Sequence, residues 1–273
     1  MSIEHRTLTV GDLQFDVRIG GPETGPTVLL LHGFPNTGAC FDNVVGRLHD
    51  SGLRTIVPDQ RGYSPGARPT AVEDYQLRHL AADAIGILDA VGVGYTMVVG
   101  HDFGSLVAWH LAGHYPHRVT GLVAVSVGHP SSIAASLASS DQRDRSSYIL
   151  DFVKPDAEDA LLAQDAKVLR DLVPDDSVLP LTERPALTAA LNWYRGNFTG
   201  DIKANLACPP IEAPTTVLWG DGDHALGREQ AEGSSRFVYS DYRFAALEGV
   251  DHWVPQNAPA ALASEIALRS AVW

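Results

Sequence analysis

The chain has 273 residues, of which 45% are hydrophobic and 19% are charged, so it is long enough to bury the large core of a globular protein. Its 33 acidic and 20 basic residues give a formal charge of −13, which argues against nucleic acid or an anionic membrane as a partner. The N-terminus lacks an apolar stretch of signal-peptide length, and no run approaches the ~20 apolar residues that span a bilayer.

The cysteine and histidine content predicts no metal site. Cys40 and Cys208 lie far apart and lack metal-ligand spacing, so we expect reduced thiols and a cytoplasmic protein. His110 and His114 are four residues apart, but the Glu of the His-Glu-x-x-His motif is missing, and we expect them on a solvated helix face. No glycine-rich nucleotide motif or phosphate loop occurs. We therefore expect neither a metal nor a cofactor.

The chain opens with a pattern typical of a β-hairpin. Leu8 and Val10 alternate with polar residues, Gly11-Asp12 supplies a two-residue turn, and the alternation resumes from Leu13 to Ile19. Continuous apolar runs, typical of strands buried on both faces, follow at 27–31, 54–58, 95–99, 122–126 and 215–219. Helical patterns lie at 39–50, 74–91, 103–114 and 257–269. This alternation predicts an α/β fold, with a mostly parallel central sheet flanked by helices.

The strand–helix alternation stops between about residues 130 and 210, where no convincing strand occurs. Three helical patterns replace it, near 142–153, after Pro155-Asp156, and near 183–195. Asp156 is a plausible N-cap for the second of them. We therefore expect a helical lid at 131–208, inserted into an α/β core that comprises 1–130 and 209–273.

The strand at 95–99 runs into the string GHDFGS, residues 100–105, which has the form of the strand-to-helix turn that carries a nucleophile in many hydrolases. Gly100 and Gly104 supply the small neighbours that such a strained turn requires. Asp102 stands at its tip, where a serine is common. Because a carboxylate is ionised at neutral pH, Asp102 can attack an sp³ carbon without a base and form an alkyl-enzyme ester.

Hydrolysis of such an ester requires a base and an oxyanion hole. His252, just after the apparent last strand, is the predicted base, and the chain order of nucleophile, acid and histidine is that of the α/β-hydrolase triad. The orienting acid is expected in the loop after the strand at 215–219, which contains Asp221 and Asp223, with Glu248 and Asp251 as alternatives. By their positions, the backbone amides of Phe34 and Phe103 are the predicted oxyanion donors.

Aromatic residues suggest how the rest of the site is built. Tyr148 and Tyr194 lie on the apolar faces of predicted lid helices, where a hydroxyl can either donate to a departing oxygen or pack at a wet edge of the core. Further aromatic side chains suggest an apolar substrate pocket, although such residues also pack in cores: Phe34, Phe103, Trp109, Trp193 and Trp253.

These strings together resemble the epoxide hydrolases of the α/β-hydrolase superfamily, from about Leu8 to the last helix. The strings that carry the resemblance are HGFP (32–35), DQRGYSPG (59–66), GHDFGS (100–105), YILDFVKPDAEDALL (148–162), LNWYRGNF (191–198), WGDGDHALG (219–227) and DHW (251–253). The resemblance implies conversion of a small apolar epoxide and water to a vicinal diol, with Tyr148 and Tyr194 gripping the oxirane oxygen and Asp223 as the acid. It also implies a cis peptide before Pro35. Detoxification is one expected role, with catabolism and a biosynthetic step as the alternatives.

The chain departs from that family at three places. Phe103 replaces the tryptophan that commonly follows the nucleophile, Asp251 replaces a small residue, and the segment between the second and third insert helices is short. The main alternative is a haloalkane or haloacetate dehalogenase, but Phe34 and Phe103 offer a halide no side-chain N–H donor. A non-catalytic binding protein of the same fold is a second alternative, and Asp102 excludes a serine esterase. A homodimer is one option for the assembly.

Overall fold

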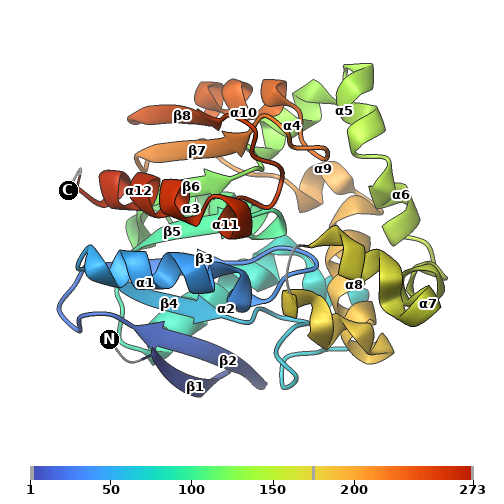
Figure 1. Cartoon of the computed structure of the whole chain (residues 1–273), viewed down its shortest axis with the longest axis horizontal. Coiled ribbons are helices and arrows are strands. Elements are labelled where there is room, and N and C mark those ends of the chain that lie inside the picture. The colour runs from blue at the N-terminus through green and yellow to red at the C-terminus, as the bar shows by residue number, and fades with distance from the viewer. Residues whose placement is uncertain (1–2, 174–175, 272–273) are drawn as a thin grey trace.

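An eight-stranded sheet forms the centre of the computed structural model, which describes residues 3–173 and 176–271 (Figure 1). The strand order is β1-β2-β4-β3-β5-β6-β7-β8, and every pairing from β4 to β8 is parallel. The strands are β1 (Ile3–Val10), β2 (Leu13–Gly20), β3 (Thr27–Leu31), β4 (Arg54–Pro58), β5 (Thr96–His101), β6 (Val119–Val125), β7 (Thr215–Gly220) and β8 (Tyr242–Leu247). The predicted fold class is therefore confirmed, and so is the hairpin of β1 and β2.

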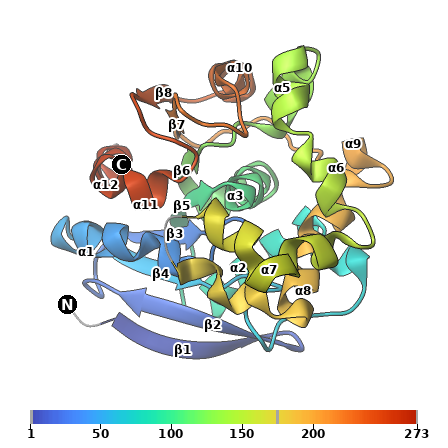
Figure 2. The same ribbon diagram turned by 45° about the vertical axis from the view of Figure 1, so that its right-hand side comes forward.

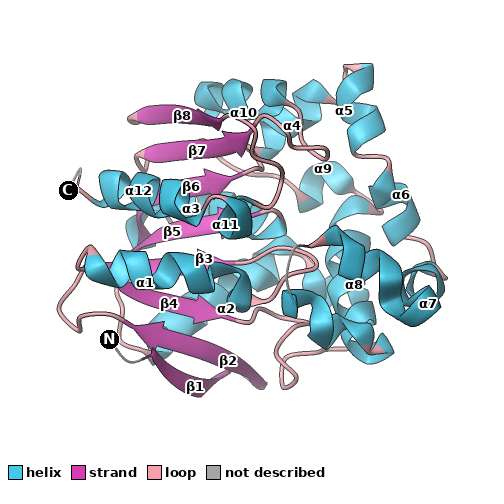
Figure 3. Ribbon diagram, in the orientation of Figure 1, coloured by secondary structure: helices cyan, strands magenta, loops and turns pink. Residues whose placement is uncertain are grey.

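Helices cover both faces of this sheet (Figures 1 and 3). One face packs against α1 (Asp42–Asp50), α11 (Val254–Asn257) and α12 (Pro259–Ser270), and the other packs against α2 (Leu77–Ala90) and α3 (Phe103–His114). Short α10 (Arg228–Gly233) lies beside β7. The predicted helix at 103–114 has the bounds of α3. Those at 39–50 and 74–91 each begin as a 3-10 helix, Gly38–Phe41 and Val72–Tyr75.

The segment between β6 and β7 is helical, as its pattern predicts. It contains a 3-10 helix, Asp176–Thr182, and the helices α4 (Pro130–Ser136), α5 (Ser140–Arg145), α6 (Tyr148–Phe152), α7 (Ala157–Leu172), α8 (Arg184–Phe198) and α9 (Ile202–Asn205). The single helix predicted at 142–153 is wrong, because the chain breaks into α5 and α6 at residues 146–147. Asp156 does precede α7, but its side chain makes no capping hydrogen bond. Residues 163–166 interrupt α7 with non-helical backbone angles.

The insert lies beyond the carboxyl ends of the parallel strands, where α6, α7 and α8 face the strand tips (Figures 1 and 2). Ligands of open α/β sheets bind at this edge. The division into a core and a lid stays a prediction. Within the described ranges, no helix combines the length and apolarity that crossing a membrane requires.

The predicted solvated face of α3 is wrong for one of its histidines. His110 is buried, and its ring lies 4.1 Å from the ring of the exposed His114, measured between centroids. The reason is that α3 packs against both β5 and α2, so little of its circumference reaches solvent. In the described parts of the chain, no group of three His, Cys, Asp or Glu side chains is arranged to hold a metal ion.

Candidate active site

Asp102 occupies a strained turn between β5 and α3. Its backbone angles, φ 53° and ψ −125°, belong to a region that L-residues rarely adopt. The turn is sterically possible because its neighbours are glycines. A Cβ added to Gly100 would lie 2.2 Å from the Gly104 carbonyl oxygen, and a Cβ added to Gly104 would lie 2.1 Å from the Leu31 carbonyl oxygen. The turn thus presents the Asp102 carboxylate at the end of the central strand, almost buried at 7% exposure.

The loop after β3 contacts one oxygen of this carboxylate. The Phe34 N–H donates to Asp102 Oδ1 over 2.8 Å, and the Phe34–Pro35 peptide is cis, as the family resemblance implies. Gly33 allows this approach, since an added Cβ would lie 2.3 Å from the same Oδ1. This role of Gly33 was not predicted, although the string HGFP contains the signal.

His252 bridges two carboxylates. Its Nδ1 lies 2.8 Å from Asp223 Oδ2, and its Nε2 lies 3.3 Å from Asp102 Oδ2. The other oxygen of Asp223 accepts the N–H groups of Ala225 and Leu226 at 2.8 and 2.9 Å, which fixes the carboxylate in its loop. The structure therefore brings together the predicted nucleophile, base and acid, each from a different strand end.

The other acids that the sequence left open lie in different contacts. Asp221 accepts the Gly249 N–H over 2.7 Å, and Asp251 accepts the Trp253 N–H over 2.9 Å. Glu248 is exposed. Asp221 and Asp251 thus bind backbone N–H groups of nearby loops, and Glu248 faces solvent. Asp223 is the carboxylate that binds the imidazole.

The charges around His252 favour its protonated form. Burial by itself lowers the pKa of this imidazole, but the carboxylates of Asp223 and Asp102 outweigh it and raise the pKa to about 10. For Asp223, burial acts to raise the pKa, yet the imidazolium and the two backbone N–H groups hold it below its ordinary value. At neutral pH the site therefore contains an imidazolium between two carboxylates.

Two further residues fix the backbone of His252. The Ser126 hydroxyl donates to the His252 carbonyl oxygen over 3.0 Å, and His101 Nε2 lies 2.9 Å from the same oxygen. Because a carbonyl only accepts, Nε2 of His101 must carry the proton. Burial lowers the pKa of His101 to about 4, so the ring is neutral. Neither His101 nor Ser126 was predicted as a site residue.

The two predicted tyrosines approach Asp102 from the insert. Tyr148 begins α6 and Tyr194 lies on α8, with ring centroids 6.4 Å apart. Burial, and then the negative charge of Asp102, raises the pKa of both phenols, so both hydroxyls remain protonated. The Asp102 carboxylate and two neutral hydrogen-bond donors thus lie in the same site.

Comparison with known proteins now places the chain in a family. Residues 26–255 match the family model described as alpha/beta hydrolase fold. The chain belongs to the α/β-hydrolase fold family. It is 31% identical to the AB hydrolase superfamily protein YfhM of Bacillus subtilis, over 89% of this chain and 90% of that protein. It is 28% identical to epoxide hydrolase A of Mycobacterium tuberculosis, over 93% of both chains. The crystal structure of epoxide hydrolase A from Mycobacterium thermoresistibile matches with a TM-score of 0.80, at 26% identity and 98% coverage of both.

Two cavities of this hydrolase meet at the predicted nucleophile and tyrosines. The first, of about 250 Å³, is lined by Asp102, Tyr148, Tyr194 and other residues that include Phe34, His252 and Trp253. The second, of about 190 Å³, shares Asp102 and both tyrosines and is otherwise almost entirely apolar, with Phe103, Leu106, Ile133, Ile149, Phe198 and Leu226 among its lining. The carboxylate therefore opens onto apolar space on two sides.

Not every aromatic residue predicted for the pocket lines it. Phe34, Phe103 and Trp253 do, but Trp193 is fully buried and stacks near His32, Tyr63 and Phe103. Its indole N–H donates to the Arg61 carbonyl oxygen over 2.8 Å, which turns the ring away from the cavities. Trp109 is likewise fully buried, and its indole N–H donates to the Val127 carbonyl oxygen over 3.0 Å.

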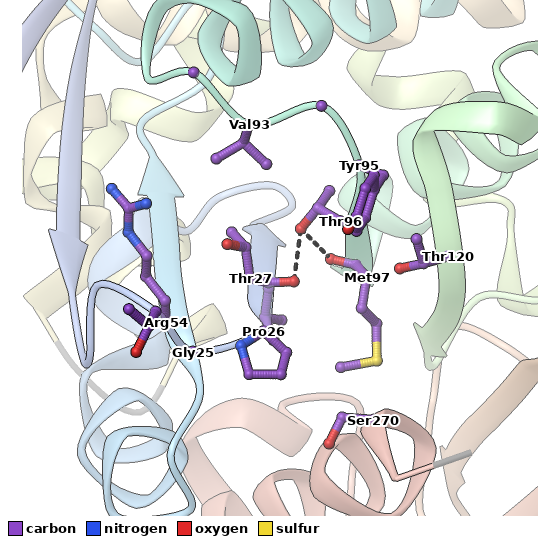
Figure 4. Close-up of a pocket in the computed structure, with 14 residues that line it drawn as sticks. Gly25, Pro26, Thr27, Arg54, Val93, Tyr95, Thr96, Met97, Thr120 and Ser270 are labelled. Atoms are coloured by element: carbon purple, nitrogen blue, oxygen red, sulfur yellow. Dashed lines mark hydrogen bonds between the residues drawn. The ribbon is translucent and has the colours of Figure 1, made fainter. Parts of the chain in front are cut away.

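A larger cavity, of about 580 Å³, lies elsewhere (Figure 4). It is lined by residues that precede or begin parallel strands, among them Thr27, Arg54 and Thr96. The Thr96 hydroxyl donates there to the Thr27 carbonyl oxygen over 2.8 Å. None of the predicted site residues lines this cavity, so the smaller cavities at the carboxyl edge are the candidate active site.

The paired His252 predicts how stability depends on pH. Because its pKa is raised from 6.5 to about 10, the folded state binds this proton more tightly than the unfolded chain. Its contribution to the free energy of unfolding is fully present below about pH 6.5 and is lost as the pH rises toward 10. We expect the difference in urea unfolding free energy between wild type and His252→Gln to shrink over this window. A constant difference would contradict a charged His252.

Proposed function

We propose that this hydrolase is an epoxide hydrolase, which converts a small apolar epoxide and water into a vicinal diol. The observation that carries the proposal is the placement of the Asp102 carboxylate and the Tyr148 and Tyr194 phenols around shared apolar cavities. Opening an oxirane requires a nucleophile at carbon and a proton donor at oxygen, and these groups supply both. Similarity to proteins named epoxide hydrolases supports the proposal.

In the first step, Asp102 Oδ2 attacks an oxirane carbon and the carbon–oxygen bond breaks. The departing oxygen takes a proton from one of the two tyrosines, while the other tyrosine donates a hydrogen bond. Oδ1 then becomes the carbonyl oxygen of the ester. It already accepts the Phe34 N–H at 2.8 Å, so one oxyanion donor is in place before the ester forms.

Ester formation also prepares the base. Once Asp102 is esterified, its negative charge is gone, and one of the two carboxylates that raise the pKa of His252 is lost. His252 can then release its proton, which restores the tyrosine that protonated the substrate. The imidazole is left neutral, and Asp223 keeps it oriented through Nδ1 at 2.8 Å.

In the second step, neutral His252 takes a proton from water as the water oxygen attacks the ester carbonyl. The negative charge that develops on Oδ1 is stabilised by the Phe34 N–H, with the Phe103 N–H as the proposed second donor. When the intermediate collapses, the bond to the alkyl oxygen breaks and the diol leaves with the proton of the nascent carboxylic acid. Asp102 returns as a carboxylate and His252 as an imidazolium, so charge and protons balance.

The dehalogenase alternative is less well supported by the donors at the site. A departing halide is stabilised by N–H groups. Of the three tryptophans predicted for the pocket, Trp253 lines the first cavity, whereas Trp193 and Trp109 donate their indole N–H groups to backbone carbonyls. The tyrosine pair instead suits a leaving group that remains attached and requires a proton. A role in detoxification, a cytoplasmic location and a homodimer stay predictions.

The proposal is tested by single turnover of styrene oxide with excess enzyme in H₂¹⁸O, beside a chlorinated analogue. Attack by Asp102 predicts unlabelled diol in the first turnover and ¹⁸O in the Asp102 carboxylate, because water supplies its oxygen to the ester carbonyl. We expect diol and no halide. Halide without diol would establish the dehalogenase, and neither product from a folded protein would establish a binding protein. Fully labelled diol in the first turnover would exclude attack by the carboxylate.

The Gly33→Ala variant tests whether the position of the carboxylate matters. Its Cβ would meet Asp102 Oδ1 at 2.3 Å, so the carboxylate or the Phe34 loop must shift. We expect kcat/KM for the epoxide to fall about 10²-fold, as misplaced reacting groups typically cause. Gly46→Ala is the matched control, because an added Cβ at Gly46 in α1 meets nothing within 4 Å. It should keep full activity and stabilise the fold by about 0.5–1 kcal/mol. Equal activity of the two variants would contradict the proposed geometry.

A further inference from the structure

The insert holds the loop that carries Asp223. Gln142 of α5 is 2% exposed, and its Nε2 donates to the Ala225 carbonyl oxygen over 3.0 Å. Its Oε1 accepts the Gly227 N–H over 2.8 Å. Ala225 is also one of the two residues whose N–H groups bind Asp223 Oδ1. The buried Gln142 amide of the insert therefore forms hydrogen bonds to the same short loop that fixes the Asp223 carboxylate.

Arg145, at the end of α5, reinforces this contact. Its Nη1 donates to the carbonyl oxygen of Asp223 itself over 2.5 Å, and its Nε pairs with Asp141 at 2.8 Å. Gly227 allows α5 to approach, because an added Cβ would lie 3.0 Å from Asp141 Oδ2 and 3.3 Å from Gln142 Oε1. The loop backbone is thus hydrogen-bonded by α5 on both sides of its turn.

The same amide reaches toward the tyrosine helix. Gln142 Nε2 also donates to Ser146 Oγ over 2.9 Å, and Ser146 lies two residues before Tyr148 at the start of α6. The amide therefore connects the loop that carries the proposed acid with the turn that precedes one proposed proton donor. Leaving such a buried amide without its partners is costly, which favours one arrangement of all three segments.

We infer that Gln142 is a positioning residue, which, together with Arg145, sets Asp223 against His252 and ties that geometry to the helix of Tyr148. The inference rests on the proposed function in so far as hydrolysis of the ester is the step that needs His252 and Asp223. Attack by Asp102 does not require the imidazole as a base. Disturbing Gln142 should therefore slow hydrolysis of the ester more than its formation.

The kinetic test uses Gln142→Met, which keeps the length of the side chain and removes its three hydrogen bonds, and Arg145→Ala. Arg143→Ala is the control, because Arg143 in the same helix donates to Leu137 and Ala138 and does not reach the Asp223 loop. In rapid-mixing experiments with styrene oxide, we expect ester hydrolysis to slow about 10- to 100-fold in Gln142→Met, with a smaller change in ester formation. Arg145→Ala should change in the same direction, and Arg143→Ala should match wild type.

A second readout needs no substrate. The charged groups around His252 are Asp102 and Asp223, and its neighbouring titratable rings are His101 and His224. We expect the proton between His252 Nδ1 and Asp223 to give a downfield NMR resonance in wild type and Arg143→Ala. As the pH is raised, this resonance should disappear at a lower pH in Gln142→Met and Arg145→Ala than in those two proteins. A merely structural role would lower stability without moving this resonance.

The two readouts separate failure of this inference from failure of the proposed function. If Gln142→Met and Arg145→Ala keep the wild-type resonance, its pH range and the wild-type rate of ester hydrolysis, the positioning role is overturned. If the resonance moves as expected while wild type turns over no epoxide, the positioning role stands and the proposed function fails.

Discussion

The His252→Gln variant is expected to stop half-way through the reaction and to carry the opened epoxide on Asp102. Glutamine cannot take a proton from water, whereas the attack by Asp102 requires no base. We expect kcat to fall about 10²- to 10⁴-fold, as losses of a general base typically do, while ester formation persists. Intact-mass measurement after mixing with styrene oxide should detect an increase equal to the mass of the epoxide.

Two variants make this result specific. Asp102→Asn combined with His252→Gln should show no adduct, because the nucleophile is gone. His110→Gln makes the same change at another buried histidine, outside the site, and should turn over normally without an adduct. Rapid diol formation by His252→Gln, with no adduct at any time, would show that His252 is not the base.

The double variant Tyr148→Phe/Tyr194→Phe is expected to fail at the opposite half of the reaction. Phenylalanine keeps the ring packing but provides no proton for the departing oxygen. Attack by Asp102 would then leave a charged alkoxide without a hydrogen-bond donor in an apolar cavity. We expect kcat to fall about 10²- to 10⁴-fold, with each single variant less affected because one donor remains. No ester should accumulate, since its formation is now the slow step.

Rapid-mixing kinetics and intact mass distinguish this variant from His252→Gln. Tyr95→Phe is the control, because Tyr95 is 69% exposed and lies beside the cavity at the other edge of the sheet. It should behave as wild type. Accumulated ester in the double variant, or unchanged turnover, would mean that the tyrosines do not act on the leaving oxygen.

The sequence was sufficient for those features that depend on neighbours along the chain. Continuous apolar runs predict buried strands because a parallel strand with helices on both faces has no polar side. The string GHDFGS predicts the turn at Asp102 because glycines at positions 100 and 104 have no Cβ. A Cβ at either position would lie 2.2 or 2.1 Å from a backbone carbonyl oxygen. The α8 segment was similarly marked by its helical spacing of apolar residues.

Other features depended on segments far apart in the sequence, and there only the folded structure decides. Asp221 and Asp223 share one loop, and the orientation of that loop determines which carboxylate reaches His252. Trp193 is an aromatic residue of the kind that lines apolar pockets, but the hydrogen bond from its indole N–H to the Arg61 carbonyl oxygen directs its ring toward the core. Nothing local marks Gln142 as a residue that positions the acid, because Ala225 and Gly227, its partners in the loop of Asp223, lie more than eighty residues away. The physical reason is that periodicity and turn chemistry act over a few residues, whereas contacts between loops depend on how the whole chain packs.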